Sequence, residues 1–253
     1  MAAKKFIAFG DSHIPYHNPA SMDIIHKVIE KEKPDIVVCL GDLLDCNQFG
    51  THPATWGMME SKYLDDTAYA NKFLDRIQKY CDRLILIEGN HEYRIDRWAA
   101  NSREGRGVYN MVAPRLQLMR DRKNCKYVPY GSANSLYPHH KINNRIVAVH
   151  GWSYAINATK KHLTMSQGRS ILHGHTHRAD TSMIQDIFVS GRIIQARSAG
   201  CTCKLIPMYG TGSPVQWVNS FVIGYLGRTN DTQYTIPITN GNCVLPDGKE
   251  IIV

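Results

Sequence analysis

Short apolar segments that stop at a glycine beside a polar side chain are the feature that most restricts the fold of this chain. Residues 6–9 are apolar and stop at Gly10-Asp11; the run within residues 35–40 stops at Gly41-Asp42, and residues 84–87 are followed by Glu88-Gly89-Asn90. Segments with apolar side chains three and four residues apart, the period of a helix, lie between them: residues 18–34 and 64–80. Strands alternating with helices predict right-handed crossovers and a parallel sheet, with functional loops at the carboxyl ends of the strands.

The second half of the chain predicts further strands. Strands expected near residues 145–149 and 170–172 flank a helix expected at residues 155–165. From residue 180 onward, short β-rich runs alternate with Gly, Asn and Pro turns: residues 192–197, 220–225 and 233–238. We therefore expect one α/β domain over residues 1–253, with a motif-bearing part at 6–178 and a β-rich part at 179–253 that completes a second sheet.

Polar clusters with oxygen or imidazole ligands occur at the ends of five predicted strands: Gly10-Asp11-Ser12-His13, Gly41-Asp42-Leu43-Leu44-Asp45, Gly89-Asn90-His91-Glu92, His150-Gly151 and Gly174-His175-Thr176-His177. In extended backbone, residues two apart point to the same side, so each Asp-x-His or His-x-His pair can present two ligands to one region. A single such residue is usually structural, but this many together would repel or need partners without a cation. The clusters predict a metal site.

These clusters resemble the calcineurin-like metallophosphoesterase superfamily. Its motifs are Asp-x-His, Gly-Asp-x-x-Asp, Gly-Asn-His-Asp/Glu, His and Gly-His-x-His, and this chain has all of them in that order between Asp11 and His177. The last third of the chain adds no motif. The resemblance is strongest to the small stand-alone phosphoesterases of bacteria and phages, and it implies a four-layer α/β/β/α sandwich of two mixed β-sheets flanked by helices.

The resemblance also implies two metal-binding sets that share Asp42. One set is Asp11, His13 and His177, and the other is Asn90, His150 and His175. His91 would be the general acid, and Asp45 would orient its imidazole; the alternative for Asp45 is a loop cap.

The expected cofactor is a pair of divalent metal ions. Carboxylate, amide and imidazole ligands suit Mn²⁺ first, with Fe or Zn²⁺ as alternatives, and a set without thiolates argues against a structural zinc or iron–sulfur site. Two ions about 3.5–4 Å apart can activate a bridging hydroxide for attack on phosphorus. The predicted activity is hydrolysis of a phosphodiester, or a phosphomonoester, of nucleotide or nucleic-acid type.

Departures from the family pattern bear on the substrate. Ser/Thr protein phosphatases have Gly directly after the first His and Arg directly after the second Asp, whereas this chain has Ile14 and Cys46 there. That activity is therefore disfavoured, although it remains an alternative. A non-catalytic scaffold of the same fold is the other alternative, and the complete ligand set argues against it.

Some residues beyond the motifs are weaker candidates for substrate contact. Trp56, in a long loop over residues 46–63, either stacks a base or packs in the core, and Arg94 meets either phosphate or water. Residues 91–126 hold nine basic and four acidic side chains, which form either a polyanion-binding surface or a solvated helical face. We interpret Cys201-Thr202-Cys203 and His139-His140 as structural.

The remaining features concern the compartment. Seven cysteines are an odd number and are mostly scattered, which indicates reduced thiols. No apolar run approaches the roughly 18 residues of a membrane helix, and the N-terminus lacks a signal-type apolar segment. We expect a soluble cytoplasmic protein that does not use a membrane as partner.

Overall fold

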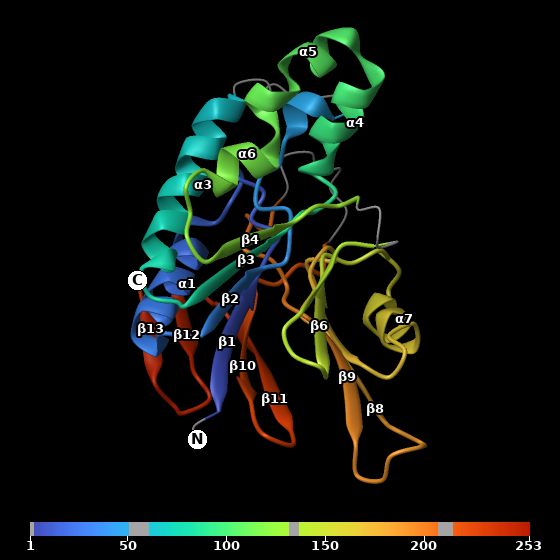
Figure 1. Ribbon diagram of the computed structural model, residues 1–253. Helices are drawn as coiled ribbons and strands as arrows, with labels where there is room; N and C mark the ends of the chain where they lie inside the picture. Colours follow the sequence, from blue (N-terminus) through green and yellow to red (C-terminus); the bar gives the residue numbers. More distant parts are fainter. Residues whose placement is uncertain (1–2, 51–60, 132–136, 207–214) are drawn as a thin grey trace.

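The computed structural model describes residues 3–50, 61–131, 137–206 and 215–253, and within them the chain forms two large mixed β-sheets packed face to face (Figure 1). Helices α1 (Pro19–Glu32) and α3 (Tyr63–Gln78) cover the outer face of the first sheet, and α7 (Ala158–Thr164) covers the second. This arrangement is the expected four-layer α/β/β/α sandwich, so the predicted fold class is confirmed.

The first sheet has the strand order β11-β10-β1-β2-β3-β4. Its parallel strands are β1 (Lys4–Phe9), β2 (Ile36–Cys39), β3 (Arg83–Ile87) and β4 (Cys125–Val128). Antiparallel strands β10 (Ser220–Leu226) and β11 (Asp231–Pro237) extend the sheet beyond β1. The parallel strands bring the loops that follow β1, β2 and β3 to one edge of the sheet.

Both faces of β1 are buried over its last four residues, Phe6 to Phe9, which explains why these are all apolar. Ile7 and Phe9 pack with the helices, whereas Phe6 and Ala8 pack between the two sheets. The pleat of a strand sends successive side chains to opposite faces, so one short segment contributes to two core layers.

The second sheet has the order β5-β6-β7-β9-β8. Its strands are β5 (His139–Lys141), β6 (Ile146–Val149), β7 (Ser170–His173), β8 (Thr181–Gln185) and β9 (Ile193–Ser198). Val147, Leu163 and Ile171 belong to the core between this sheet and α7. Strands β6 and β7 are parallel, so the loops after them also share an edge.

Smaller elements complete the described part of the chain. Helices α4 (Tyr93–Asn101), α5 (Arg103–Val112) and α6 (Pro114–Met119) follow the loop after β3 and lie at the top of Figure 1. A 3₁₀ helix, η1 (Asn47–Phe49), follows the loop after β2, and β12 (Asn242–Val244) pairs with β13 (Glu250–Ile252). None of the described helices has the length and apolarity that a membrane crossing requires.

The C-terminal part differs from the prediction that residues 179–253 complete the second sheet. Strands β8 and β9 do join that sheet, but β10 and β11 return to the first sheet, where β10 pairs with β1. The reason is that β1 would otherwise be an edge strand with unpaired backbone groups. The sequence of β10 is apolar on both faces, which suits this interior position: Phe221 packs toward the helices and Val222 between the sheets.

Candidate metal centre

The candidate ligands lie in the loops after β1, β2, β3, β6 and β7, and many of them have left-handed backbone. The φ angles are positive at Asp11 (52°), His13 (48°), Asp42 (49°), His175 (71°) and His177 (57°). The expectation that extended backbone pairs these side chains is therefore wrong. Each such residue costs about 1–3 kcal/mol, and backbone hydrogen bonds between the loops hold them in place.

Asp11, His13 and His177 converge and form the first candidate set. The Nε2 atoms of the two imidazoles are 3.1 Å apart, and Nε2 of His177 is 3.3 Å from Oδ1 of Asp11. All three residues are buried. The loop after β1 donates backbone N–H groups from Asp11 to the carbonyl of Gly41 (3.0 Å) and from His13 to that of Asp42 (2.9 Å), so it is tied to the loop after β2.

Asp42, Asn90, His150 and His175 form the second candidate set. Nε2 of His150 is 2.8 Å from Oδ1 of Asn90, 3.0 Å from Nδ1 of His175 and 3.3 Å from Oδ2 of Asp42. The same Oδ2 atom is 3.8 Å from Nε2 of His13 in the first set. The Asp42 carboxylate therefore lies between the two sets.

The donor atoms of these sets suit divalent cations. Imidazole nitrogens face each other at about 3 Å in a buried space with carboxylates beside them, an arrangement that positive charge between the atoms stabilises. Burial alone would raise the pKa of Asp42, but the imidazoles of His150 and His91 lower it well below its ordinary value. Burial and the charge of His150 lower the pKa of His175 to about 3, which leaves its imidazole neutral with a free lone pair.

Glycines beside the ligands are required by close packing of the carboxylates. A Cβ atom at Gly89 would lie 2.0 Å from Oδ1 of Asp42, and one at Gly174 would lie 2.4 Å from Oδ2 of Asp11. The backbone N–H of His175 donates to both oxygens of Asp11, at 3.0 and 2.9 Å. Any side chain at these glycines would push the carboxylates out of position.

His91 and Asp45 lie together beside the two sets. Oδ2 of Asp45 is 3.3 Å from Nδ1 of His91 and 3.0 Å from Nδ1 of His13, so the carboxylate is shared between two imidazoles. Burial lowers the pKa of His91, but the negative charges of Asp42 and Asp45 outweigh it and raise the pKa above its ordinary value. The Asp45 carboxylate therefore faces two imidazoles, and its role in orienting His91 stays a prediction.

Arg94 reaches back from α4 to this pair. Its Nη2 atom is 3.0 Å from Nε2 of His91, and its Nη1 atom donates to the backbone carbonyl of Asp45 at 2.9 Å. The side chain is only 16% exposed. The guanidinium thus lies against the candidate acid, and contact of Arg94 with phosphate stays a prediction.

Glu92 has a position that the sequence interpretation did not assign, although it belongs to the Gly89-Asn90-His91-Glu92 motif. Its buried carboxylate accepts backbone N–H groups from Asp42 (3.1 Å), Leu44 (2.8 Å) and Gly89 (3.0 Å). Burial and the charge of Asp42 raise the pKa of Glu92 to about 7. Glu92 therefore fastens the loop after β2 to the loop after β3, and both loops carry candidate ligands.

Aromatic and sulfur groups at the centre were also not predicted. The ring of Tyr154 lies 3.8 Å from that of His175 and is 66% exposed, and Trp217 lies 4.3 Å from His177. Neither belongs to a motif, so no local sequence signal marks them. Cys203, which we interpreted as structural, contacts His177.

The other weak candidates have different outcomes. Trp56 lies outside the described residues. The basic stretch 91–126 forms α4, α5, α6 and β4, and part of its charge is used internally, because Arg122 pairs with Asp75 and donates to Oδ1 of Asn71 at 2.8 Å. Other arginines of the stretch are exposed: Arg97, Arg103, Arg106, Arg115 and Arg120.

The chain matches a known family model in sequence and known structures in fold. The family model described as calcineurin-like phosphoesterase matches residues 4–179. Vacuolar Protein Sorting 29 from Cryptosporidium parvum is similar in fold over 100% of both chains, with 12% identity and a TM-score of 0.53. Vps29 complexed with zinc from Entamoeba histolytica covers 98% of this chain and 96% of its own, with 15% identity and a TM-score of 0.48. The phosphoesterase YfcE from E. coli covers 98% and 96%, with 14% identity and a TM-score of 0.43. No curated protein matches the chain.

Proposed function

The chain belongs to the calcineurin-like phosphoesterase family, and on this premise we propose that it hydrolyses phosphoesters with two divalent cations. The observation that carries the proposal is the position of the Asp42 carboxylate, whose Oδ2 atom is 3.3 Å from His150 of one set and 3.8 Å from His13 of the other. Asp11, His13 and His177 would hold one cation, and Asn90, His150 and His175 the other, with Asp42 shared. We propose Mn²⁺ as the physiological ion, with Fe or Zn²⁺ as alternatives.

The chemistry divides between the cations and the protein. When bound, two divalent ions lower the pKa of a water molecule and stabilise negative charge on phosphoryl oxygens. His91 supplies the proton that the leaving alkoxide needs, because the negative charges of Asp42 and Asp45 favour its protonated form. Arg94 donates to Nε2 of His91 in this structure, so Arg94 must move away before Nε2 can hold that proton. Asp45 is a positioning residue, because its backbone carbonyl (3.0 Å) and its carboxylate (3.3 Å) both face Nδ1 of His91. Nε2 of the same ring lies 3.9 Å from Oδ2 of Asp42.

Arg94 supports recognition of an anionic substrate. Its guanidinium lies 3.0 Å from Nε2 of His91, so two groups that attract phosphate oxygens stand side by side. A phosphoryl group that enters the centre would draw Arg94 away from His91 by a charge-assisted hydrogen bond, and Nε2 would then face the leaving oxygen.

We propose a phosphodiester of nucleotide or nucleic-acid type as the preferred substrate class, with a phosphomonoester second. Cys46 follows Asp45, where protein phosphatases have an arginine. Arg94 is then the arginine that remains near the centre to bind the doubly charged phosphate of a monoester. The exposed arginines on α4 to α6 favour a polyanion. A protein phosphatase is the alternative enzyme. A non-catalytic scaffold is the alternative without chemistry, and the complete set of ligand-type residues, all buried except the half-buried Asn90, argues against it.

A substrate panel with the full chain tests the proposal. The Mn²⁺-loaded protein is assayed on generic mono- and diesters, cyclic nucleotides, single-stranded nucleic acid and phosphopeptides, with the Asp42→Asn variant as the inactive control. Hydrolysis of diesters that the variant lacks is expected. Faster turnover of phosphopeptides than of any diester would replace the substrate class, and no hydrolysis of any ester by a metal-loaded protein would favour the scaffold.

A further inference from the structure

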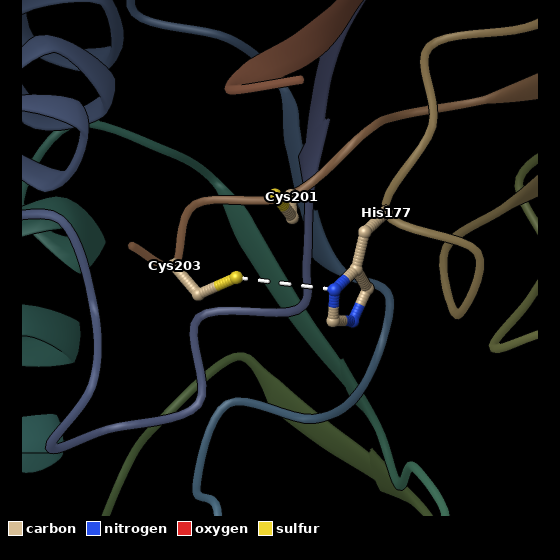
Figure 2. Close-up of side chains that lie close together, drawn as sticks. All are labelled: His177, Cys201 and Cys203. Atoms are coloured by element: carbon tan, nitrogen blue, oxygen red, sulfur yellow. Dashed lines mark hydrogen bonds between the residues drawn. The ribbon is translucent and has the colours of Figure 1, made fainter. Parts of the chain in front are cut away.

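Cys201, Cys203 and His177 form a cluster of metal-binding side chains beside the first candidate set (Figure 2). The thiols and the imidazole are 0%, 3% and 7% exposed, respectively. Their ligand atoms all lie within 4.8 Å of one another, and Sγ of Cys203 is 3.9 Å from Nδ1 of His177. Two thiols and an imidazole are a softer donor set than the carboxylates and imidazoles around Asp42.

Backbone hydrogen bonds fix the two thiols in place. Cys201 donates its N–H to the carbonyl of Val218 at 2.9 Å, and Thr202 donates to the carbonyl of Gly10 at 3.2 Å. The hydroxyl of Thr202 is 2.7 Å from that of Ser12. Residues 201–203 are thus held between the start of β10 and the loop after β1. Thr202 faces that loop, while the flanking cysteines stand near His177.

The two ring nitrogens of His177 face different donor sets, one the first candidate set and the other the two cysteines. Its Nε2 atom faces Asp11 at 3.3 Å, within the first candidate set. Its Nδ1 atom faces Cys203, as the dashed line in Figure 2 shows. The ring therefore lies between two sets of donors of different hardness.

We propose that Cys201, Cys203 and Nδ1 of His177 form a third cation site, which takes a thiophilic divalent ion such as Zn²⁺ or Cd²⁺. Bond lengths of about 2.3 Å to sulfur and 2.0–2.1 Å to nitrogen place the ligand atoms of a tetrahedral site roughly 3.5 Å apart. The observed 3.9 Å between sulfur and nitrogen is close to that value. Binding releases the two thiol protons to solvent, and water fills the fourth position.

A cation at the third site should weaken cation binding at the first candidate set, because the two sites share His177. A neutral imidazole has one lone pair, so a cation on Nδ1 leaves the proton on Nε2, where it faces Asp11. Holding cations on both nitrogens requires loss of that second proton as well. A thiophilic ion would therefore weaken Mn²⁺ binding at Asp11 and His13 and inhibit the enzyme. This coupling rests on the proposed function, whereas the third site itself does not.

A Cd²⁺ titration of the reduced, metal-free full chain tests the site directly, through the ultraviolet sulfur-to-cadmium charge-transfer band. The wild type is expected to develop a band that saturates at one ion. The single variants Cys201→Ser and Cys203→Ser should each weaken Cd²⁺ binding. Loss of a group that only hydrogen bonds to a ligand costs roughly 10–100-fold in affinity, and loss of a thiol ligand itself should cost more. Cys81→Ser, at a partly buried thiol away from the cluster, is the matched control and should bind as the wild type does.

The outcomes separate this proposal from the proposed function. Absence of a saturable band in the wild type would overturn the third site, and so would a band of equal affinity in both serine variants. Circular dichroism of the metal-free variants shows whether they are folded, and one folded variant is enough for the comparison. A Cd²⁺ band that depends on Cys203, in a protein with no esterase activity, would refute the proposed function and leave the third site standing.

Discussion

Asp42 is the residue on which a two-cation centre depends, because its carboxylate is the group that faces both candidate sets. Its Oδ1 atom accepts the backbone N–H of His91 at 2.9 Å, and this hydrogen bond holds Oδ2 toward the imidazoles. The opposing Gly89 leaves room for the carboxylate, whereas a Cβ atom at the preceding Gly41 would lie 2.6 Å from Nδ1 of His150.

We expect Asp42→Asn to bind fewer than two Mn²⁺ ions per chain and to lose more than about 10²-fold in activity. Loss of a group that only hydrogen bonds to a metal ligand costs about 10–100-fold, and Asp42 is itself a proposed ligand. Elemental analysis after Mn²⁺ loading and dialysis measures the first effect. Asp82→Asn, at an exposed carboxylate, is the control. One bound ion in the wild type, together with unchanged activity in the variant, would refute the two-cation centre.

His91→Ala should retain both metal ions and lose roughly 10²–10⁴-fold in rate on substrates with poor leaving groups, which is the usual contribution of a general acid. Activated aryl esters should be affected less, because their leaving groups need no proton. His139→Ala, on an exposed strand, serves as the control. Loss of metal in the His91 variant would make His91 a ligand instead of an acid.

At the scale of elements, the centre is a set of loops that hydrogen bonds fasten to one another. Glu92, at the start of α4, accepts hydrogen bonds from three backbone N–H groups of the loops after β2 and β3. Glu88, at the end of β3, accepts the hydroxyl of Tyr127 at 3.0 Å and the backbone N–H of Tyr130. Two buried carboxylates thus stabilise the edge of the sheet from which the ligands project.

Glu92→Ala should lower the free energy of unfolding by at least about 2 kcal/mol, because a buried donor without an acceptor costs about 1–3 kcal/mol. Denaturant unfolding of the metal-free protein measures the loss. Glu104→Ala, at an exposed position on α5, should change little. Equal stability of the two variants would show that the loops do not need the Glu92 carboxylate.

Glu88 should make the stability of the protein depend on pH. Burial raises the pKa of Glu88 to about 8 from an ordinary value of 4.5, so the folded state binds more protons between these two values. Stability therefore falls as pH rises from about 4.5 to about 8. Glu88→Gln removes the ionisable group, and its one carbonyl oxygen can still accept the backbone N–H of Tyr130. Its amide N–H groups can donate to the hydroxyl oxygen of Tyr127, which reverses the present hydrogen bond.

The Glu88→Gln variant should lose only the part of this decline that Glu88 causes, since Glu92, with a pKa raised to about 7, remains. The variant should exceed the wild type by a few kcal/mol above pH 8, because one pKa unit corresponds to about 1.4 kcal/mol. Thermal or denaturant unfolding across this pH range provides the measurement. Parallel stability curves for the two proteins would mean that Glu88 is ionised in the folded state at neutral pH.

At the scale of the whole molecule, the two sheets bring loops from distant parts of the chain to one centre. Loops after β1, β2 and β3 come from the first sheet, and loops after β6 and β7 come from the second. The apolar layer between the sheets, which includes Phe6, Val38 and Leu172, sets their relative position. Helices α4 to α6 project from the same edge and carry the exposed arginines (Figure 1).

If these arginines hold a polyanion, hydrolysis of nucleic acid should fall steeply with salt, whereas hydrolysis of a small diester should change little. Removing Arg97 or Arg103 should reduce the salt slope for nucleic acid by about one per lost phosphate contact. Lys31→Ala, on the exposed side of α1, is the control. Equal salt curves for both substrates would exclude this surface as a binding site.

The sequence alone determined the α/β class, the order of the elements around the five ligand loops and the polar side chains at the strand ends, while its resemblance to a known family implied the four-layer arrangement. It could do so because strand and helix periods are local, and because the ends of parallel strands share an edge wherever the sheet forms.

Long-range contacts decided the rest. Pairing of β10 with β1 depends on an edge that otherwise lacks partners, and the left-handed turn at Asp11 depends on hydrogen bonds to the loop after β2. Cys203 reaches His177 because residues 201–203 pair with the loop after β1, nearly two hundred residues earlier in the chain. No local pattern records such contacts, so only the tertiary structure revealed them.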